Sequence, residues 1–203
     1  MSVVTRWGRR RSVPARSLQT MRTHRVVMTL LMLASPSAFA RDPFPDITNA
    51  ELSTLLVTLH NSYRAQHHAP ALTVDASIVA YAKTRARTVS TFEGLSEGHR
   101  GLDHKYGENL YWAGSSTNAE QSTQLVTAAV KAWYNEIAHY NFKNGGFSAG
   151  TGHFTQLVWK GTTKIGCAVA RGKGSKWYET YVVCNYLAPG NMMGDFQKNV
   201  LPK

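Results

Sequence analysis

Two glutamates in this sequence occupy positions where a carboxylate needs a partner. Glu108 comes directly before an apolar, aromatic run, and Glu136 falls on the apolar stripe of a helix expected over residues 119–140. A carboxylate among apolar side chains is costly unless a base or a hydrogen-bond donor meets it. Histidine is a suitable partner, because an imidazole serves as a ligand and a proton carrier near neutral pH. The two carboxylates and nearby histidines therefore favour a shared His/Glu site.

One histidine, His153, stands at the start of an alternating stretch over residues 152–159. Large apolar groups fall on both sides of that stretch, which predicts a strand covered on both faces. A histidine there is either a satisfied core residue or part of a site. By contrast, His60, His67 and His68 have no partner at ligand spacing and are expected at the surface.

Helices are expected before and after the first carboxylate. A capping-box pattern at residues 48–51 opens a helix that ends before Pro70. Asp75 can cap a second helix, and the 119–140 segment is the third. The second helix carries basic side chains that are expected to face outward and to make at most a weak contact with anionic lipid head groups: Lys83, Arg85 and Arg87.

Two strand-like runs, residues 164–170 and 177–184, are joined by a turn-rich, charged linker and predict a hairpin. Each run carries one of the two cysteines, Cys167 and Cys184. An isolated pair in an exported chain usually forms a disulfide, which here would stabilise the fold by roughly 3 kcal/mol. Two free buried thiols are the alternative in a reducing compartment. The glycine-rich loop at residues 144–152 lacks the pattern of a nucleotide-binding loop.

The first 40 residues are interpreted as a leader. Residues 21–40 have the basic start, short apolar run and small-x-small end of a secretory signal. Residues 1–20 are either an extension of its basic region or the result of a start codon assigned too early. An uncleaved anchor or an organelle transit peptide is the alternative. Residues 41–203 are expected to form a single exported domain, extracellular or, in a bacterium, periplasmic. The leader holds seven arginines and no acid, so the net charge of +11 falls to +4 without it, which argues against nucleic-acid binding.

Four short stretches together resemble the CAP superfamily of cysteine-rich secretory proteins, antigen 5 and pathogenesis-related 1 proteins, whose module is also called the SCP domain. In chain order they are residues 107–110, 133–136, 152–167 and 181–191. The glycine-rich loop and the 199–202 tail are similar to the Golgi-associated plant pathogenesis-related type. The resemblance implies an α+β fold, a three-layer α-β-α sandwich with a central, mainly antiparallel sheet. It also matches a Cys167–Cys184 bridge.

The same resemblance implies a cleft with two histidines and two glutamates. Carried over by position, these are His153, Glu108, Glu136 and a histidine before the Gly-Glu-Asn motif. His99 is favoured for the last place, and His104 remains the alternative. Such a set could hold Zn²⁺ or another divalent cation, with the carboxylates orienting the imidazoles.

Binding of sterols, fatty acids or other lipids without catalysis is the function that the resemblance favours. An apolar groove beside the sheet is expected from four aromatic side chains: Tyr111, Trp112, Phe142 and Phe147. The alternatives are a metal-dependent hydrolase or protease using the same cleft, and a secreted signalling or defence protein acting through a protein partner. The hydrolase is less favoured, because the sequence has no HExxH helix and no nucleophile-elbow serine.

Overall fold

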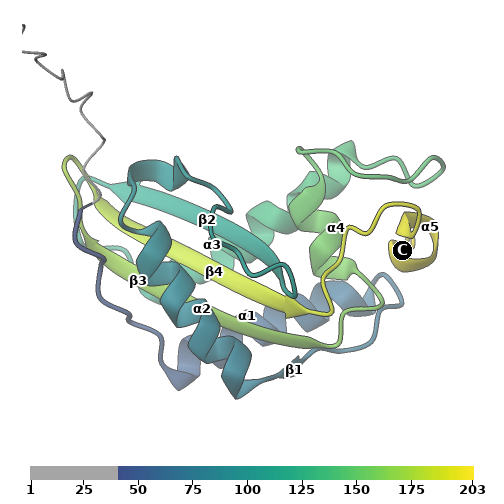
Figure 1. The fold of residues 1–203 in the computed structure, drawn as a ribbon, viewed down its shortest axis with the longest axis horizontal. Helices are drawn as coiled ribbons and strands as arrows, with labels where there is room; N and C mark the ends of the chain where they lie inside the picture. The colour runs from purple at the N-terminus through teal and green to yellow at the C-terminus, as the bar shows by residue number, and fades with distance from the viewer. Residues whose placement is uncertain (1–40) are drawn as a thin grey trace, which may run out of the picture. The chain divides into compact units, whose positions relative to one another are not determined.

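A four-stranded sheet organises the computed structural model, which describes residues 41–203 (Figure 1). The strand order is β1 (Thr73–Val74), β3 (Lys164–Lys173), β4 (Tyr178–Leu187) and β2 (Gly107–Ser115). β1 runs parallel to β3, and the other two pairings are antiparallel, so the expected mainly antiparallel sheet is confirmed. The signal expected at residues 21–40 lies outside the described residues.

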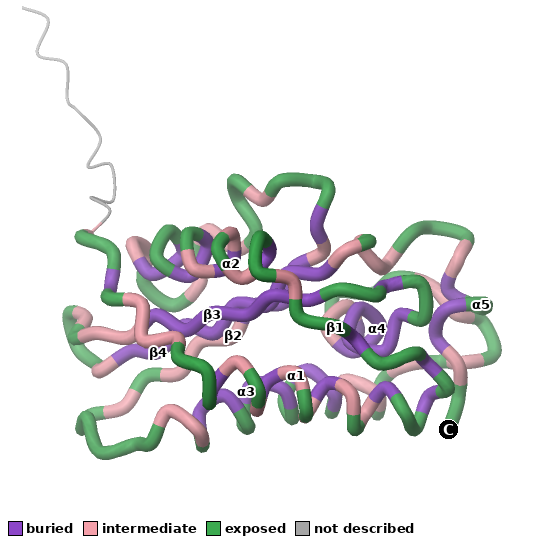
Figure 2. Tube along the Cα trace, turned by 90° about the horizontal axis from the view of Figure 1, so that it is seen from below, coloured by how far each residue is buried: buried purple, intermediate pink, exposed green. Residues whose placement is uncertain are grey.

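Helices cover both faces of this sheet (Figure 2). α2 (Ala76–Val89) lies on one face, and α1 (Ala50–Ala65) and α3 (Ser122–Asn135) lie on the other. Shorter helical segments complete the chain: η1 (Glu93–Leu95), η2 (Glu136–His139), α4 (Gly152–Val158) and α5 (Phe196–Asn199). No helix within residues 41–203 has the length and apolar character needed to cross a bilayer.

Strand alternation divides the core into two clusters. On β3, Ile165, Cys167 and Val169 pack with α1 and α3, whereas Ala168 and Ala170 pack with α2. This follows from the two-residue period of a strand, whose successive side chains point to opposite faces. The three-layer α-β-α sandwich implied by the resemblance is therefore confirmed.

The disulfide expected in the hairpin is present. Cys167 and Cys184 lie opposite each other on β3 and β4 and are bonded. Both are almost fully buried in the cluster that faces α1 and α3. The bond thus fastens the two central strands of the sheet to each other.

The first two helix starts differ in how well they match the sequence patterns. Asp75 caps α2 as expected, since its carboxylate accepts the backbone N–H groups of Ser77 and Ile78. In α1 the cap is Asn49, whose side chain accepts the N–H of Leu52, so the capping box at residues 48–51 begins one residue too early.

The strand expected at residues 152–159 is wrong, because the segment forms helix α4. Its alternation also fits a helix, since Phe154, Leu157 and Val158 fall three and four residues apart and are all fully buried in the core. The third helix is also shorter than expected. α3 ends at Asn135, and Glu136 begins the following 3₁₀ turn.

Two histidines expected at the surface, His60 and His67, are buried. His60 donates through Nδ1 to the Leu56 carbonyl at 2.7 Å, and its Nε2 accepts the Tyr186 hydroxyl at 2.8 Å. Burial lowers the pKa of His60 to about 4, so the ring is neutral in the folded protein at neutral pH. His68 is exposed, as expected.

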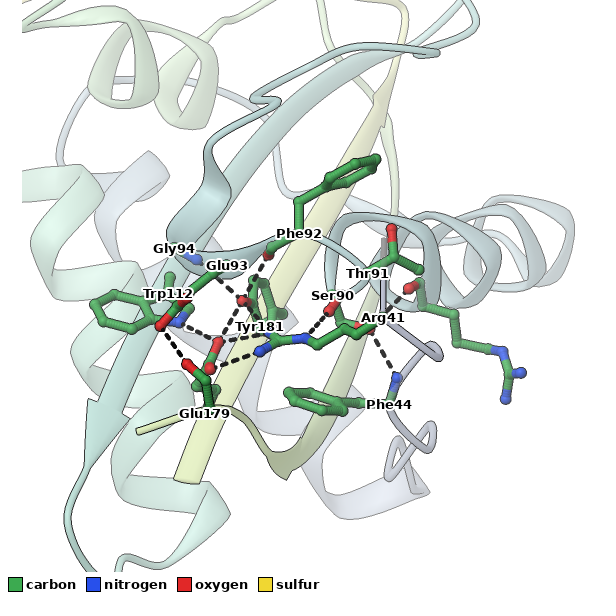
Figure 3. Close-up of polar contacts among 12 residues, drawn as sticks. Arg41, Phe44, Ser90, Thr91, Phe92, Glu93, Gly94, Trp112, Glu179 and Tyr181 are labelled. Carbon is green, nitrogen blue, oxygen red and sulfur yellow. Dashed lines mark hydrogen bonds and ion pairs between the residues drawn. The ribbon is translucent and has the colours of Figure 1, made fainter. Parts of the chain in front are cut away.

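The segment that precedes α1 is fastened to the sheet by a buried carboxylate (Figure 3). Glu179 of β4 has a fully buried side chain and receives both guanidinium arms of Arg41, at 2.8 and 2.7 Å. The indole N–H of Trp112 and the hydroxyl of Tyr181 also donate to Glu179. The Arg41 guanidinium lies 4.2 Å from the centre of the Phe44 ring, so residues 41–44 fold back onto β4.

Candidate functional site

Glu108, the second residue of β2, is held by an arginine of α2. Arg85 donates through Nε and Nη2 to the two carboxylate oxygens of Glu108 at 2.7 and 2.8 Å. The side chain of Glu108 is fully buried, and Asn185 of the neighbouring strand donates to it at 3.1 Å. Burial alone would raise the pKa of Glu108, but the hydrogen bonds from Arg85 and His99 lower it to about 2.

The expectation that Arg85 faces outward is therefore wrong. Arg85 is only 3% exposed, whereas Arg87 on the same helix is exposed. The spacing of the helix carries the signal, because Arg85 follows the buried Ala82 by three residues and so lies on the apolar stripe. A cation on that stripe is the partner that the buried carboxylate requires.

His99 completes the first half of the site. Its Nδ1–H donates to Glu108 Oε1 at 3.0 Å, while half of its side chain remains exposed. The structure brings His99 and not His104 to Glu108, since His104 lies exposed in the following turn. The His99 loop is itself fixed to α2, because Arg85 Nη1 donates to the Arg100 carbonyl at 2.9 Å.

Glu136 and His153 form the second half. His153 Nδ1–H donates to Glu136 Oε1 at 2.6 Å, and the backbone N–H groups of His153 and Phe154 donate to Oε2 at 2.9 and 3.1 Å. One carboxylate thus satisfies the first turn of α4 and orients its histidine. Burial raises the pKa of Glu136, but these hydrogen bonds outweigh it, so the pKa lies below its ordinary value.

Edge strand β2 contacts both pairs. Glu108 belongs to the first pair, and the side chain of the next residue, Asn109, donates to the His153 carbonyl at 3.0 Å. The Trp133 indole lies nearly parallel to the His153 ring, at 24° and 6.4 Å between centres, and donates to the Leu110 carbonyl at 2.9 Å. The four residues of the predicted tetrad thus form two His/Glu pairs, His99 with Glu108 and His153 with Glu136.

Helix α4 is fixed at its other end by an arginine that the sequence did not single out. Arg64 of α1 is fully buried, and its Nη1 donates to the carbonyls of Leu157 and Trp159, both at 2.9 Å. Its Nη2 donates to the Thr162 carbonyl at 2.8 Å. Burial lowers the pKa of Arg64 to about 10, which leaves it charged at neutral pH. Arg64 therefore helps to position the helix that presents His153.

The arrangement determines which atoms are free for chemistry. Each carboxylate accepts from Nδ1 of its histidine, so Nε2 of each ring is the nitrogen that this pairing leaves free for a ligand. Within residues 41–203, no group of three or more His, Cys, Asp or Glu is placed to hold a metal ion. Glu108 and Glu136 each fix the orientation of one imidazole ring.

The four aromatic residues expected to line one groove are dispersed. Tyr111 and Trp112 are neighbours on β2 and pack against the two different core clusters, because adjacent strand residues face opposite ways. Phe142 packs against His67 and other aromatic rings of the core. Phe147 is 56% exposed. The structure thus does not bring these side chains together in one groove.

An apolar hollow lies instead beside the first His/Glu pair. A cavity of about 320 Å³ separates the last turn of α2 from the loop that carries His99. It is lined by Thr88, Val89, Phe92, Glu97, Gly98, Arg100 and Gly101. Gly101 lies in van der Waals reach of the Arg85 guanidinium, so the hollow adjoins the Arg85–Glu108–His99 network. Its volume is at the lower end of the range for small-molecule sites.

Comparison with known proteins places these features in a family. The model of the cysteine-rich secretory protein family, CAP, matches residues 57–186. Protein PRY2 of Saccharomyces cerevisiae is 40% identical over 153 residues, covering 75% of this chain and 42% of PRY2. The Golgi-associated plant pathogenesis-related protein 1 of Homo sapiens is 33% identical over 145 residues, covering 70% of this chain and 88% of the human protein.

Solved structures agree with this assignment. The crystal structure of NaASP2 with Zn²⁺ superposes with a TM-score of 0.56 at 29% identity, covering 79% of this chain and 90% of that protein. The chain spans only about two fifths of PRY2 and of the secreted protein RBT4 of Candida albicans. The matching family model, the relatives and the shared fold together show that this chain belongs to the cysteine-rich secretory protein (CAP) family.

Proposed function

We propose that this protein is exported and binds a sterol or another lipid without catalysing a reaction. The observation that carries the proposal is the apolar hollow next to the Arg85–Glu108–His99 network, where Val89 and Phe92 supply apolar surface. A lipid could place its apolar body against these residues and a polar end toward His99, whose ring is half exposed. Fatty acids are the second candidate class for the same hollow.

Export is supported by the sequence and by relatives. Residues 21–40 have the pattern of a secretory signal. Among the relatives are the secreted protein RBT4 of Candida albicans and the salivary antigen-5 of Dipetalogaster maximus, at 37% and 41% identity over the matched residues. The disulfide between β3 and β4 also suits an oxidising compartment.

The chemistry of the two His/Glu pairs supports a binding role over a catalytic one. Both oxygens of Glu108 are engaged by Arg85, and its pKa of about 2 makes it a poor proton acceptor at neutral pH. Within residues 41–203, the hydrogen bonds of His99 and His153 join neither ring to a serine or cysteine side chain. A nucleophile activated by a base, as covalent hydrolysis requires, thus has no support here.

A divalent cation such as Zn²⁺ is a second element of the proposal. His99 and His153 would bind it through Nε2, and Glu108 and Glu136 would keep both rings oriented. With two protein ligands, water would complete the coordination sphere, and the ion would stiffen the site. Calorimetric titration with Zn²⁺ tests this: wild type should show one saturable site and His153→Ala none, and equal binding by both would contradict it.

Binding of a fluorescent sterol to the purified protein tests the proposed hollow. Phe92→Gln should weaken sterol affinity at least about fivefold, because the replaced ring forms part of the apolar wall. Trp177→Gln is the matched control, since Trp177 is 40% exposed and lies outside that wall. Equal affinities for the two variants would remove the hollow as the binding site.

A further inference from the structure

Three apolar side chains stand out from the surface near helix α4. Met193 is 80% exposed, Phe147 56% and Met192 52%. They are three of the five large apolar side chains exposed within residues 41–203, the others being Val74 and Trp177. An exposed apolar group of this kind marks a contact surface more often than a single exposed residue does.

The three side chains come from two loops that the fold joins. Phe147 lies on the glycine-rich loop, and its ring lies against Gly152 at the start of α4. Asn191, next to Met192, donates to the Gly152 carbonyl at 2.9 Å and accepts from the Thr155 hydroxyl at 2.6 Å. Both loops therefore rest on the first turn of α4, and Figure 1 shows them at the α4–α5 end of the described residues.

A second bond ties the same loops farther out. The Gln197 side chain of α5 donates to the Lys143 carbonyl at 2.9 Å, and Gly145 lies close to that side chain. Phe147, Met192 and Met193, here named the apolar tip, thus project from a frame that is hydrogen-bonded at two places. Exposure of the apolar tip is a consequence of the fold and not of an unattached loop.

The segments that supply the apolar tip carry a surplus of positive charge. Residues 137–163 and 188–203, which supply these loops and α4–α5, contain four lysines and one carboxylate, Asp195. The remainder of the 41–203 chain is nearly balanced, with twelve Lys or Arg and eleven acids. Asp195 is paired with Lys198 at 2.8 Å. The surplus charge is carried by Lys143, Lys160 and Lys203.

We propose that the apolar tip is a membrane-docking surface that inserts Phe147, Met192 and Met193 into a bilayer with anionic head groups. Apolar side chains gain free energy in the acyl boundary, and Lys143, directly before the glycine-rich loop, gains from anionic lipids. Methionine suits such a contact because its flexible, polarisable chain adapts to an irregular partner. An anionic bilayer matches both the apolar and the basic character of this end.

This surface differs from the one suggested by the basic run of α2, where Arg85 is buried on Glu108. The inference deepens the proposed function, because it names the lipid surface from which a bound sterol would be collected or to which it would be delivered. The apolar tip is separate from the hollow at Val89 and Phe92, so the two can be tested independently.

Flotation with sterol-free vesicles tests the docking surface. The purified protein should float with vesicles of phosphatidylcholine and phosphatidylserine, less with phosphatidylcholine alone, and less at high salt. Met192→Gln/Met193→Gln should lower the partition coefficient at least about tenfold, because two exposed apolar side chains lose their gain on insertion. Val74→Gln, which alters an exposed apolar side chain on β1, is the control and should leave partitioning unchanged.

Equal partitioning of the double variant and the Val74→Gln control would overturn the proposal, as would a wild-type protein that does not float. Capture of an acidic protein without any flotation would also overturn it. A protein that binds sterol in solution but fails to float contradicts the docking surface alone. A protein that floats but binds no lipid ligand contradicts the proposed function alone.

Discussion

At the scale of single residues, the site depends on how each buried carboxylate is neutralised. The need of Glu108 for a partner is visible in the sequence, because the residue directly precedes an apolar, aromatic run. Its main partner, Arg85, lies 23 residues away in a basic run expected at the surface, although its spacing from Ala82 places it on the apolar stripe of the helix. The packing of α2 on the sheet then brings this side chain, and not Arg87, to Glu108.

Replacement of Arg85 tests the importance of that pair. Arg85→Met should lower the free energy of unfolding by about 3–5 kcal/mol, because it leaves the charge of Glu108 buried without a cation. Arg87→Met, two residues along the same helix and exposed, should change it by less than about 0.5 kcal/mol. Urea denaturation of both variants measures the difference, and equal losses would refute the pairing.

Glu136 should matter through its three hydrogen bonds. Glu136→Ala removes the acceptor for His153 Nδ1 and for two backbone N–H groups of α4, and should cost about 1–3 kcal/mol. Glu120→Ala is the control, because Glu120 is exposed and precedes α3. Thermal melts of both variants are the measurement. A melting temperature for Glu136→Ala equal to that of the control would show that Glu136 does not hold α4.

At the scale of elements, the sequence predicts best where local signals agree. The hairpin of β3 and β4, the Asp75 cap and the disulfide are confirmed, since turn residues, a capping side chain and paired cysteines act over short distances. The strand expected at residues 152–159 fails, because its pattern satisfies both a two-residue and a helical period. A distant carboxylate, Glu136, accepts the first N–H groups of the helix and so favours it.

The segment before α1 offers a prediction at this scale. Two ion pairs fasten it, the buried Arg41–Glu179 pair and the partly exposed Lys83–Asp46 pair at 3.0 Å. Arg41→Gln should cost about 3 kcal/mol or more, because Glu179 remains buried without its cation. Lys83→Gln should cost less than about 1 kcal/mol. Urea denaturation of the two variants measures the loss in free energy of unfolding. A loss for Lys83→Gln as large as that for Arg41→Gln would contradict this account.

At the scale of the whole molecule, the resemblance to the CAP superfamily supplies the architecture that periodicity alone cannot. It implies the three layers and the four tetrad positions, and the structure brings those positions together as two pairs. The position of the apolar hollow could not be predicted from the resemblance or from periodicity. Strand alternation separates Tyr111 from Trp112, and Phe147 is exposed, whereas the hollow forms between α2 and the loop that follows it.

Stability should fall with acidity in two pH ranges. His60 has a pKa of about 4 when folded and about 6.5 when unfolded, so the unfolded chain binds the proton first as pH falls from 6.5 to 4. This should remove about 3 kcal/mol and then level off. The contribution of Glu108, whose pKa is about 2 when folded, is complete above about pH 5 and is lost as pH falls toward 2.

Urea denaturation at a series of pH values tests the assignment of the upper range. His60→Gln removes the titrating ring, so its free energy of unfolding, relative to its own value at pH 7.5, should fall less between pH 6.5 and 4 than that of wild type. His68→Gln, at an exposed histidine, is the control and should keep the wild-type slope. Identical slopes for His60→Gln and wild type would contradict the buried neutral state of His60.

The central claim, lipid binding by an exported CAP protein, is tested most directly by sterol capture. A radiolabelled sterol is incubated with the purified protein, and an excess of unlabelled sterol serves as competitor. The account predicts saturable binding with micromolar or tighter affinity that the unlabelled sterol displaces. Absence of any competable binding, with folding verified by circular dichroism, would contradict sterol binding. It would favour the alternative that the protein acts through a protein partner.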